Sequence, residues 1–101
     1  MRGILRAVKV RVKLELGDRV IDETLSAANA DDLLVAVKGR VERELGWKGM
    51  FLKALSPIGF AQEAVRRLNG SLGTNYALPQ TADEFLALGT DLGFVTPLEE
   101  S

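Results

Sequence analysis

The chain has 101 residues, a length that fits one ordinary domain. Hydrophobic residues make up 47% of it and charged residues 27%, which is the balance of a soluble globular protein rather than a disordered one. It contains no cysteine and no histidine. Disulfides, thiolate nucleophiles, histidine-based triads and the usual zinc and haem sites are therefore excluded, and we expect no metal and no cofactor.

The net charge of −1 conceals an uneven distribution. Residues 1–13 carry five positive charges and no negative one, whereas residues 80–101 carry five negative charges and no positive one. Such asymmetry is typical of a nucleic-acid-binding arm, or of two ends that neutralise each other within a fold or across a dimer. No apolar run approaches the roughly 20 residues of a membrane span, and the basic start lacks the apolar stretch of a signal peptide. We therefore expect a cytoplasmic protein without a membrane partner.

A strand and a hairpin open the chain. Apolar and charged residues alternate from Val8 to Leu16, which predicts a strand with one buried face that starts as early as Ile4. Gly17-Asp18 then predicts a two-residue turn of type II′. The resulting register places Lys13 opposite Asp22, an opposite-charge pair. It also puts Glu23 on the apolar face, which indicates that the second strand is bulged or lies at the sheet edge.

Three later segments have apolar residues at helical spacing, and each follows a residue type that caps helices. The predicted helices cover residues 30–45, 57–68 and 82–92, with the caps Asn29, Ser56 and Thr81. Gly39 lies in the middle of the first helix, where it costs about 1 kcal/mol relative to alanine unless another group packs closely there. Between the first two helices, the run from Met50 to Leu55 predicts a short, apolar third strand.

These elements predict an α+β fold with the order ββαβαα. A right-handed connection favours a three-stranded, mainly antiparallel sheet in the order 2-1-3, with the first strand in the centre. Helices would cover one face, which gives two layers. We expect a single domain over residues 1–96 and a frayed carboxyl-terminal tail over residues 97–101.

A basic stripe on the first strand is the clearest candidate for a binding surface. The basic residues predicted to point away from the core are Lys9, Arg11 and Lys13. The possible contacts to nucleic acid or a partner are Arg6, Lys9, Arg11 and Lys13, with Arg2 and Lys53 as extensions. Alternation alone also produces a charged outer face that contacts only solvent. No aromatic residue that could stack on bases lies on this strand, which weakens a role in binding single-stranded RNA.

The loop over residues 70–79 is the second candidate, because it exceeds the usual connection length. It holds the only tyrosine, and its possible contact residues are Thr74, Asn75 and Tyr76. An aromatic ring with a polar tip is a good anchor for an interface. Alternatively, Leu72 and Leu78 fold back with the tyrosine and close the gap between the second and third helices. The Gly70–Gly73 spacing matches that of an RNA-clamping loop but lacks basic neighbours.

Residues 81–100, TADEFLALGTDLGFVTPLEE, resemble the closing helix of the leader domains of ribosomally made, enzyme-modified peptides. Those domains are wholly helical and continue into a core peptide that often contains cysteines. This chain instead opens with a hairpin and has no cysteine. The resemblance covers about a fifth of the chain and implies only a capped amphipathic helix that ends in Leu-Gly-Phe.

The residue types and the short sheet favour a function in binding. Acidic doublets at the starts of helices are explained as capping residues, and no recognisable catalytic motif is present. A small sheet with exposed edges favours contact with other chains. We therefore expect a non-enzymatic protein-interaction or regulatory module that acts as a homo-oligomer. A nucleic-acid-binding module that uses Lys9, Arg11 and Lys13 is the alternative, and an enzyme built from lysine, tyrosine, serine and carboxylates ranks third.

Overall fold

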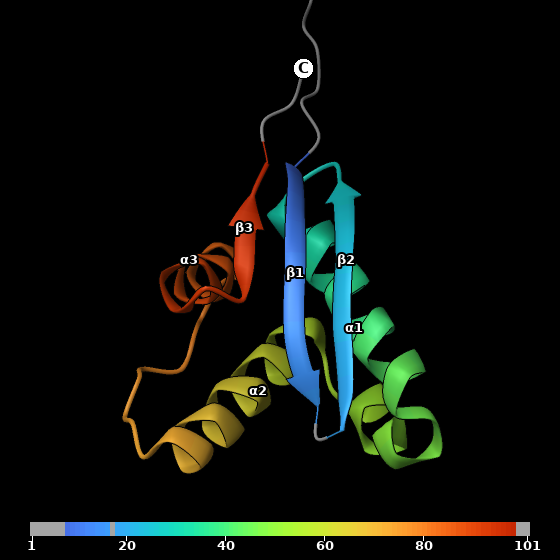
Figure 1. Ribbon diagram of the computed structural model, residues 1–101, viewed down its shortest axis with the longest axis vertical. Helices are drawn as coiled ribbons and strands as arrows, with labels where there is room; N and C mark the ends of the chain where they lie inside the picture. Colours follow the sequence, from blue (N-terminus) through green and yellow to red (C-terminus); the bar gives the residue numbers. More distant parts are fainter. Residues whose placement is uncertain (1–7, 17, 99–101) are drawn as a thin grey trace, which may run out of the picture.

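An antiparallel three-stranded sheet carries the helices on one of its faces (Figure 1). The computed structural model describes residues 8–16 and 18–98. Its elements are β1 (Val8–Leu16), β2 (Arg19–Ala27), α1 (Ala30–Leu45), the 3-10 helix η1 (Gly46–Ala54), α2 (Pro57–Leu72), α3 (Ala82–Leu92) and β3 (Val95–Pro97). The strand order is β2-β1-β3. The α+β class and the sheet order 2-1-3 are therefore confirmed.

The hairpin has the register that its alternation and its turn predict. Pairing runs without interruption from Val8 opposite Ala27 to Leu16 opposite Arg19, with Lys13 opposite Asp22. Because the pairing is continuous, β2 has no bulge, and Glu23 is accommodated by the position of β2 at the edge of the sheet. The turn residue Gly17 and the proposed start of the strand at Ile4 lie outside the described residues.

The predicted third strand over Met50–Leu55 is wrong, because that segment lies almost entirely in η1. The third strand is β3, which pairs with residues 10–12 of β1. The order is thus ββ, α1, η1, α2, α3, β3 rather than ββαβαα. A short apolar run does not distinguish a strand from a helical turn, so the periodicity of this segment left the choice open.

The sheet also extends beyond residue 96, where the sequence predicted that the domain ends. β3 includes Pro97, and the backbone N–H of Leu98 donates to the carbonyl of Lys9 at 2.9 Å. A proline is tolerated here because β3 is an edge strand whose outer side needs no donor. Residues 99–101 of the predicted tail lie outside the described residues.

Local capping signals correctly predicted the starts of the helices. The side chains of Asn29, Ser56 and Thr81 accept hydrogen bonds from backbone N–H groups at 2.8, 3.0 and 3.1 Å. The end of α2 was predicted too early, because the helix continues to Leu72. Gly73 ends it in the left-handed conformation, with φ of 68°, which glycine adopts without strain.

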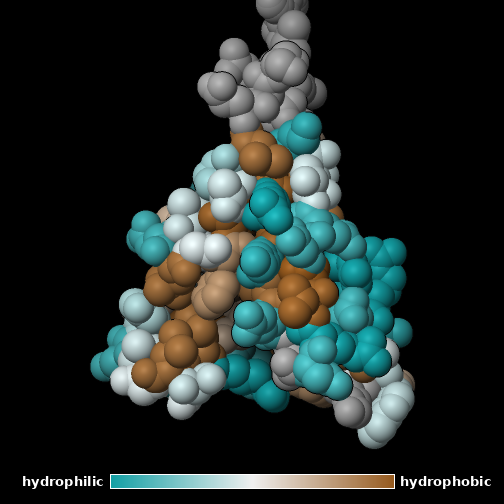
Figure 2. Space-filling model, viewed as in Figure 1, coloured by the Kyte–Doolittle hydropathy of each residue, from teal (hydrophilic) through white to brown (hydrophobic). Residues whose placement is uncertain are grey.

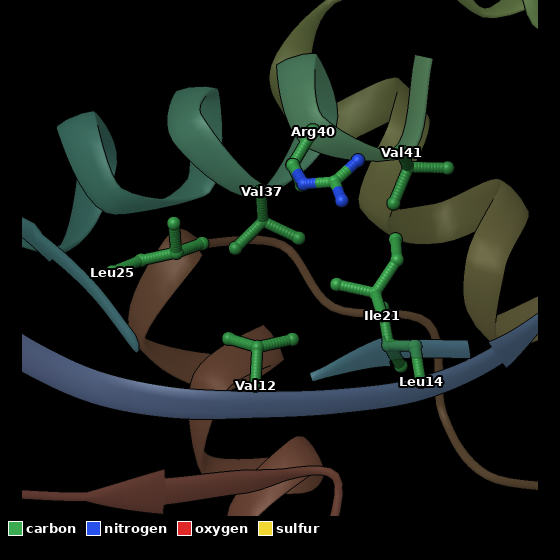
Figure 3. A pocket seen from close by; sticks show the side chains of 7 residues that line it. All are labelled: Val12, Leu14, Ile21, Leu25, Val37, Arg40 and Val41. Carbon is green, nitrogen blue, oxygen red and sulfur yellow. The ribbon is translucent and has the colours of Figure 1, made fainter. Parts of the chain in front are cut away.

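The hydrophobic core lies between the sheet and the helices. Its buried members are Val10, Val12, Ile21, Leu33, Leu34, Val37, Val41, Leu52, Phe60, Ala61, Ala82 and Val95. Figure 3 shows side chains of β1, β2 and α1 pointing into this layer, where they line a shallow hollow. The hollow leaves no room for a water-sized molecule, so it is part of the packing rather than a ligand site.

Candidate interaction surface

The basic stripe lies on the sheet face opposite the helices. Lys9, Arg11 and Lys13 are exposed there, and Figure 2 shows hydrophilic residues along the middle of this face. Arg6 and Arg2 lie outside the described residues, and Lys53 belongs to η1 rather than to the sheet. The structure thus brings together three of the candidate cations.

One member of this stripe is neutralised by a carboxylate on β2. Arg11 donates from Nε and Nη2 to the two carboxylate oxygens of Asp22, at 2.9 and 2.8 Å. This hydrogen bonding lowers the pKa of Asp22, and the attraction of Lys13 acts in the same direction. Lys13 lies directly opposite Asp22 as predicted, but the bidentate partner of Asp22 is the diagonal Arg11. Of the three cations of the stripe, Lys9 and Lys13 are therefore the two that do not share this bidentate pair with Asp22.

An ion-pair network links β2 to α1 and explains the acidic residue on the apolar face. Arg40 of α1 donates to Glu23 and to Glu44, the latter at 3.0 Å, and Arg19 bonds to Glu44 at 3.2 Å. Hydrogen bonds from Arg19 and Arg40 lower the pKa of Glu44. Glu23 is therefore satisfied by a helix that lies far away in the sequence, which the hairpin pattern alone could not show.

The loop after α2 is held by Asn69. Its side chain accepts hydrogen bonds from the Thr74 hydroxyl and the Tyr76 N–H, both at 2.9 Å, and donates to the Tyr76 carbonyl at 3.0 Å. Asn75 is exposed. Tyr76 and Leu78 are half-buried, but Leu72 is 56% exposed and does not fold back with them as one of the two alternatives expected. The loop is thus fastened through the backbone of Tyr76, a contact that no local pattern indicated.

A surface that the sequence analysis missed lies on η1. Trp47, Met50 and Phe51 expose 77%, 62% and 47% of their surface. The guanidinium of Arg67, on α2, lies 5.0 Å from the centre of the Phe51 ring. Lys53 is exposed on the same short helix. We call Trp47, Met50, Phe51, Lys53 and Arg67 the η1 surface.

The local sequence explains why these side chains point outward. Gly49 and Leu52 are buried and Leu55 is half-buried, so every third residue of this segment faces the protein. A spacing of three is the repeat of a 3-10 helix. A Cβ at Gly49 would lie 2.9 Å from the Cβ of Leu45, so this position requires glycine. The three-residue spacing of glycine and leucine is the signal that could have identified η1.

The residues that the structure describes form neither a metal site nor a membrane-spanning helix. The described part of the chain contains no cluster of three or more acidic side chains arranged to hold a metal ion. Within residues 8–16 and 18–98, none of the helices is both long enough and apolar enough to cross a membrane. Comparison with protein-family models, with curated proteins and with solved structures finds no match to this chain. Function is therefore inferred from the chemistry of the surfaces described above.

Proposed function

We propose that the protein is a non-enzymatic protein-interaction module that acts as a homo-oligomer, and that the η1 surface binds its partner. The observation that carries this proposal is the exposure of Trp47 beside Met50 and Phe51 on one short helix. Tryptophan, methionine, phenylalanine and arginine are the residue types enriched where protein interfaces gain most of their binding energy. Contiguous apolar exposure of this kind marks interaction sites on otherwise polar surfaces.

The charge around the η1 surface indicates the chemistry of the partner. Residues 46–62 contain no acidic residue. The nearest carboxylate beyond them, Glu63, already accepts hydrogen bonds from both Arg66 and Arg67. Lys53 and Arg67 therefore border the apolar side chains with net positive charge. We infer that the occupant is a protein segment with exposed apolar side chains interleaved with carboxylates.

The test compares partner capture by three baits: the wild type, Met50→Ser/Phe51→Ser, and the control Val35→Ser. Val35 is also an exposed apolar residue, 52% exposed, but it lies on α1. An acidic protein retained by the wild type and by the control, and lost by the η1 variant, supports the proposal. Trp47 is the only tryptophan, so adding the purified partner should shift its fluorescence to shorter wavelength. Identical capture by all three baits refutes the proposal.

The same fluorescence distinguishes a protein partner from a lipid surface. Aromatic and basic residues also occur where helices lie on anionic membranes. A blue shift of Trp47 with anionic phospholipid vesicles, and none with the captured protein, would assign the η1 surface to a membrane and overturn the proposal.

The open face of the sheet favours a second candidate function, nucleic-acid binding. Lys9 and Lys13 are exposed on a face that none of the described helices covers. Binding through them would weaken steeply with salt and would be lost in the Lys9→Gln/Lys13→Gln variant. No retardation of duplex or single-stranded probes at low salt would end this candidate. The cytoplasmic location expected from the sequence stays a prediction.

A further inference from the structure

We propose that two copies of the chain pair through the free edge of β2, antiparallel about a two-fold axis at Thr24, with α1 of one copy packed against α1 of the other. The proposal deepens the homo-oligomer part of the proposed function and rests on it. The proposed dimer interface contains no residue of the η1 surface, so an experiment can refute the dimer without refuting partner binding by the η1 surface, and the reverse.

The hydrogen bonds of the sheet show which backbone groups of β2 have no partner among the described residues. The N–H of Lys13 donates to the carbonyl of Phe94, and the carbonyl of Lys9 accepts from Leu98. The odd-numbered residues of β1 therefore bond toward β3, and the even-numbered ones toward β2. In the observed register, the residues of β2 whose backbone groups point away from the sheet are Val20, Asp22, Thr24 and Ser26.

This edge has few of the features that usually prevent pairing with another chain, and its two central carboxylates, Asp22 and Glu23, are already paired with Arg11 and Arg40. β2 is nine residues long, contains neither proline nor lysine, and pairs with β1 without a bulge. Unpaired strands of this length readily accept a further strand. Thr24, next to the middle of the strand, and Ser26, near its end, are small, uncharged and exposed.

Charge restricts how two β2 strands can pair. An axis at Asp22 or at Glu23 would place like carboxylates opposite each other, which is unfavourable. An axis at Thr24 instead places Thr24 opposite Thr24 of the second copy, Asp22 opposite Ser26, and Glu23 opposite Leu25. Axes at Ile21, Leu25 and Ser26 also avoid opposing like charges, so the strand alone does not fix the register.

Helix α1 selects the axis at Thr24. Asp32, Ala36, Gly39 and Arg43 follow one another at spacings of four, three and four, so they form one stripe along α1. If two such helices pack antiparallel about the midpoint of this stripe, each Ala36 meets Gly39 of the second copy. Each Asp32 then meets Arg43 of the second copy at the ends. The stripe is thus complementary to itself in both size and charge.

The relative positions of β2 and α1 along the strand direction also favour the axis at Thr24. Val37 and Val41 of α1 line the same hollow as Leu25 and Ile21 of β2, so the middle of this helical segment lies near the level of Glu23, the ion-pair partner of Arg40. Helix α1 runs along β2 on the helical side of the sheet (Figure 1). A strand rises roughly 3.3 Å and a helix roughly 1.5 Å per residue. One strand residue from Glu23 to Thr24 therefore corresponds to about two helix residues from Arg40. Thr24 therefore lies level with the midpoint between Ala36 and Gly39 of α1. Leu25 lies about half a helical turn beyond that midpoint, so an axis at Leu25 would not bring each Ala36 opposite Gly39 of the second copy.

Gly39 supplies an independent observation. Glycine is unfavourable in the middle of a helix, and a Cβ placed at Gly39 meets no atom within 4 Å. Packing within the described residues therefore gives no reason for a glycine at this position. A second helix in close contact would give one, because small residues let helix axes approach to about 8 Å.

Cysteine cross-linking tests the register directly, since the native chain has no cysteine. Residues opposite each other in a hydrogen-bonded pair have Cα atoms about 5.5 Å apart, within the range of a disulfide. Oxidised Thr24→Cys is expected to become a covalent dimer. Asp22→Cys alone and Ser26→Cys alone are expected to stay uncross-linked, whereas their mixture gives a mixed dimer. Equal cross-linking at all three positions, or none at Thr24, overturns the register.

Sedimentation tests the dimer itself. The wild type is expected to have twice the chain mass at micromolar concentration, and a wild-type monomer overturns the proposal. Thr24→Lys, which adds a charge to the edge, is expected to be monomeric, whereas Thr96→Lys on β3 remains dimeric. Gly39→Ala is expected to raise the dimer dissociation constant at least tenfold while the fold stays intact.

Two outcomes separate this interface from the other surfaces. Met50→Ser/Phe51→Ser is expected to leave cross-linking unchanged, so loss of partner binding and loss of the dimer are distinguishable. A Thr24→Cys chain that sediments as a monomer but forms a disulfide with a different protein would assign the β2 edge to a foreign strand. That result overturns pairing with a second copy.

Discussion

Replacing Asn69 with alanine is expected to release the loop between α2 and α3. The substitution removes three side-chain hydrogen bonds, of 2.9, 2.9 and 3.0 Å, to Thr74 and Tyr76. A single hydrogen bond contributes about 0.5–1.5 kcal/mol net, and a partly buried group left unpaired costs more. The free energy of unfolding should therefore fall by about 2–4 kcal/mol, a large share of the roughly 5–15 kcal/mol typical of a domain.

Urea denaturation followed by far-ultraviolet circular dichroism measures this change, with two matched controls. Thr74→Val replaces the hydroxyl with a methyl group, which removes one of the three hydrogen bonds, and should lower the free energy of unfolding by about 1 kcal/mol. Asn75→Ala alters an exposed neighbour in the same loop and should stay within about 0.5 kcal/mol of the wild type. If Asn69→Ala were no less stable than Asn75→Ala, Asn69 would not fasten the loop and our reasoning would be wrong.

Three further outcomes are expected. Leu34→Ala truncates a side chain that is only 1% exposed and should lower stability by about 2.5–5 kcal/mol in the same urea assay. Gly89→Ala places a Cβ 2.8 Å from Cγ2 of Val95, so it should cost about 1–3 kcal/mol and weaken the pairing of β3, measurable by amide hydrogen exchange. Because Arg19 and Arg40 lower the folded-state pKa of Glu44, its stabilisation is present above the ordinary value near 4.5 and is lost as the pH falls through the lowered value. Glu44→Gln should therefore have a lower urea midpoint than the wild type at neutral pH, and the two midpoints should approach each other in acid. A difference in midpoint that did not change with pH would contradict this role of Glu44.

The parts of the structure that the sequence predicted well are those governed by neighbouring residues. The alternation from Val8 to Leu16 and a two-residue turn determine the register of the hairpin, because shifting a strand by one residue would move every buried side chain to the other face. The caps Asn29, Ser56 and Thr81 act within three residues of their own position. Such interactions can be recognised without knowledge of the rest of the chain.

Tertiary structure decided the features that depend on partners distant in the chain. β3 has only three residues and forms because α3 returns the chain beside β1, so its own periodicity is too short to predict it. Glu23 is satisfied by Arg40, 17 residues away. The loop residue Tyr76 is bonded by Asn69, only seven residues earlier, but across the end of α2. The exposure of the η1 surface became visible only in the structure, where Gly49 and Leu52 are buried and Trp47, Met50 and Phe51 are exposed. Local patterns specify the backbone conformation of a segment and which of its side chains point to the same side. The pairing of polar groups and the exposure of apolar ones depend instead on which elements the fold places next to each other.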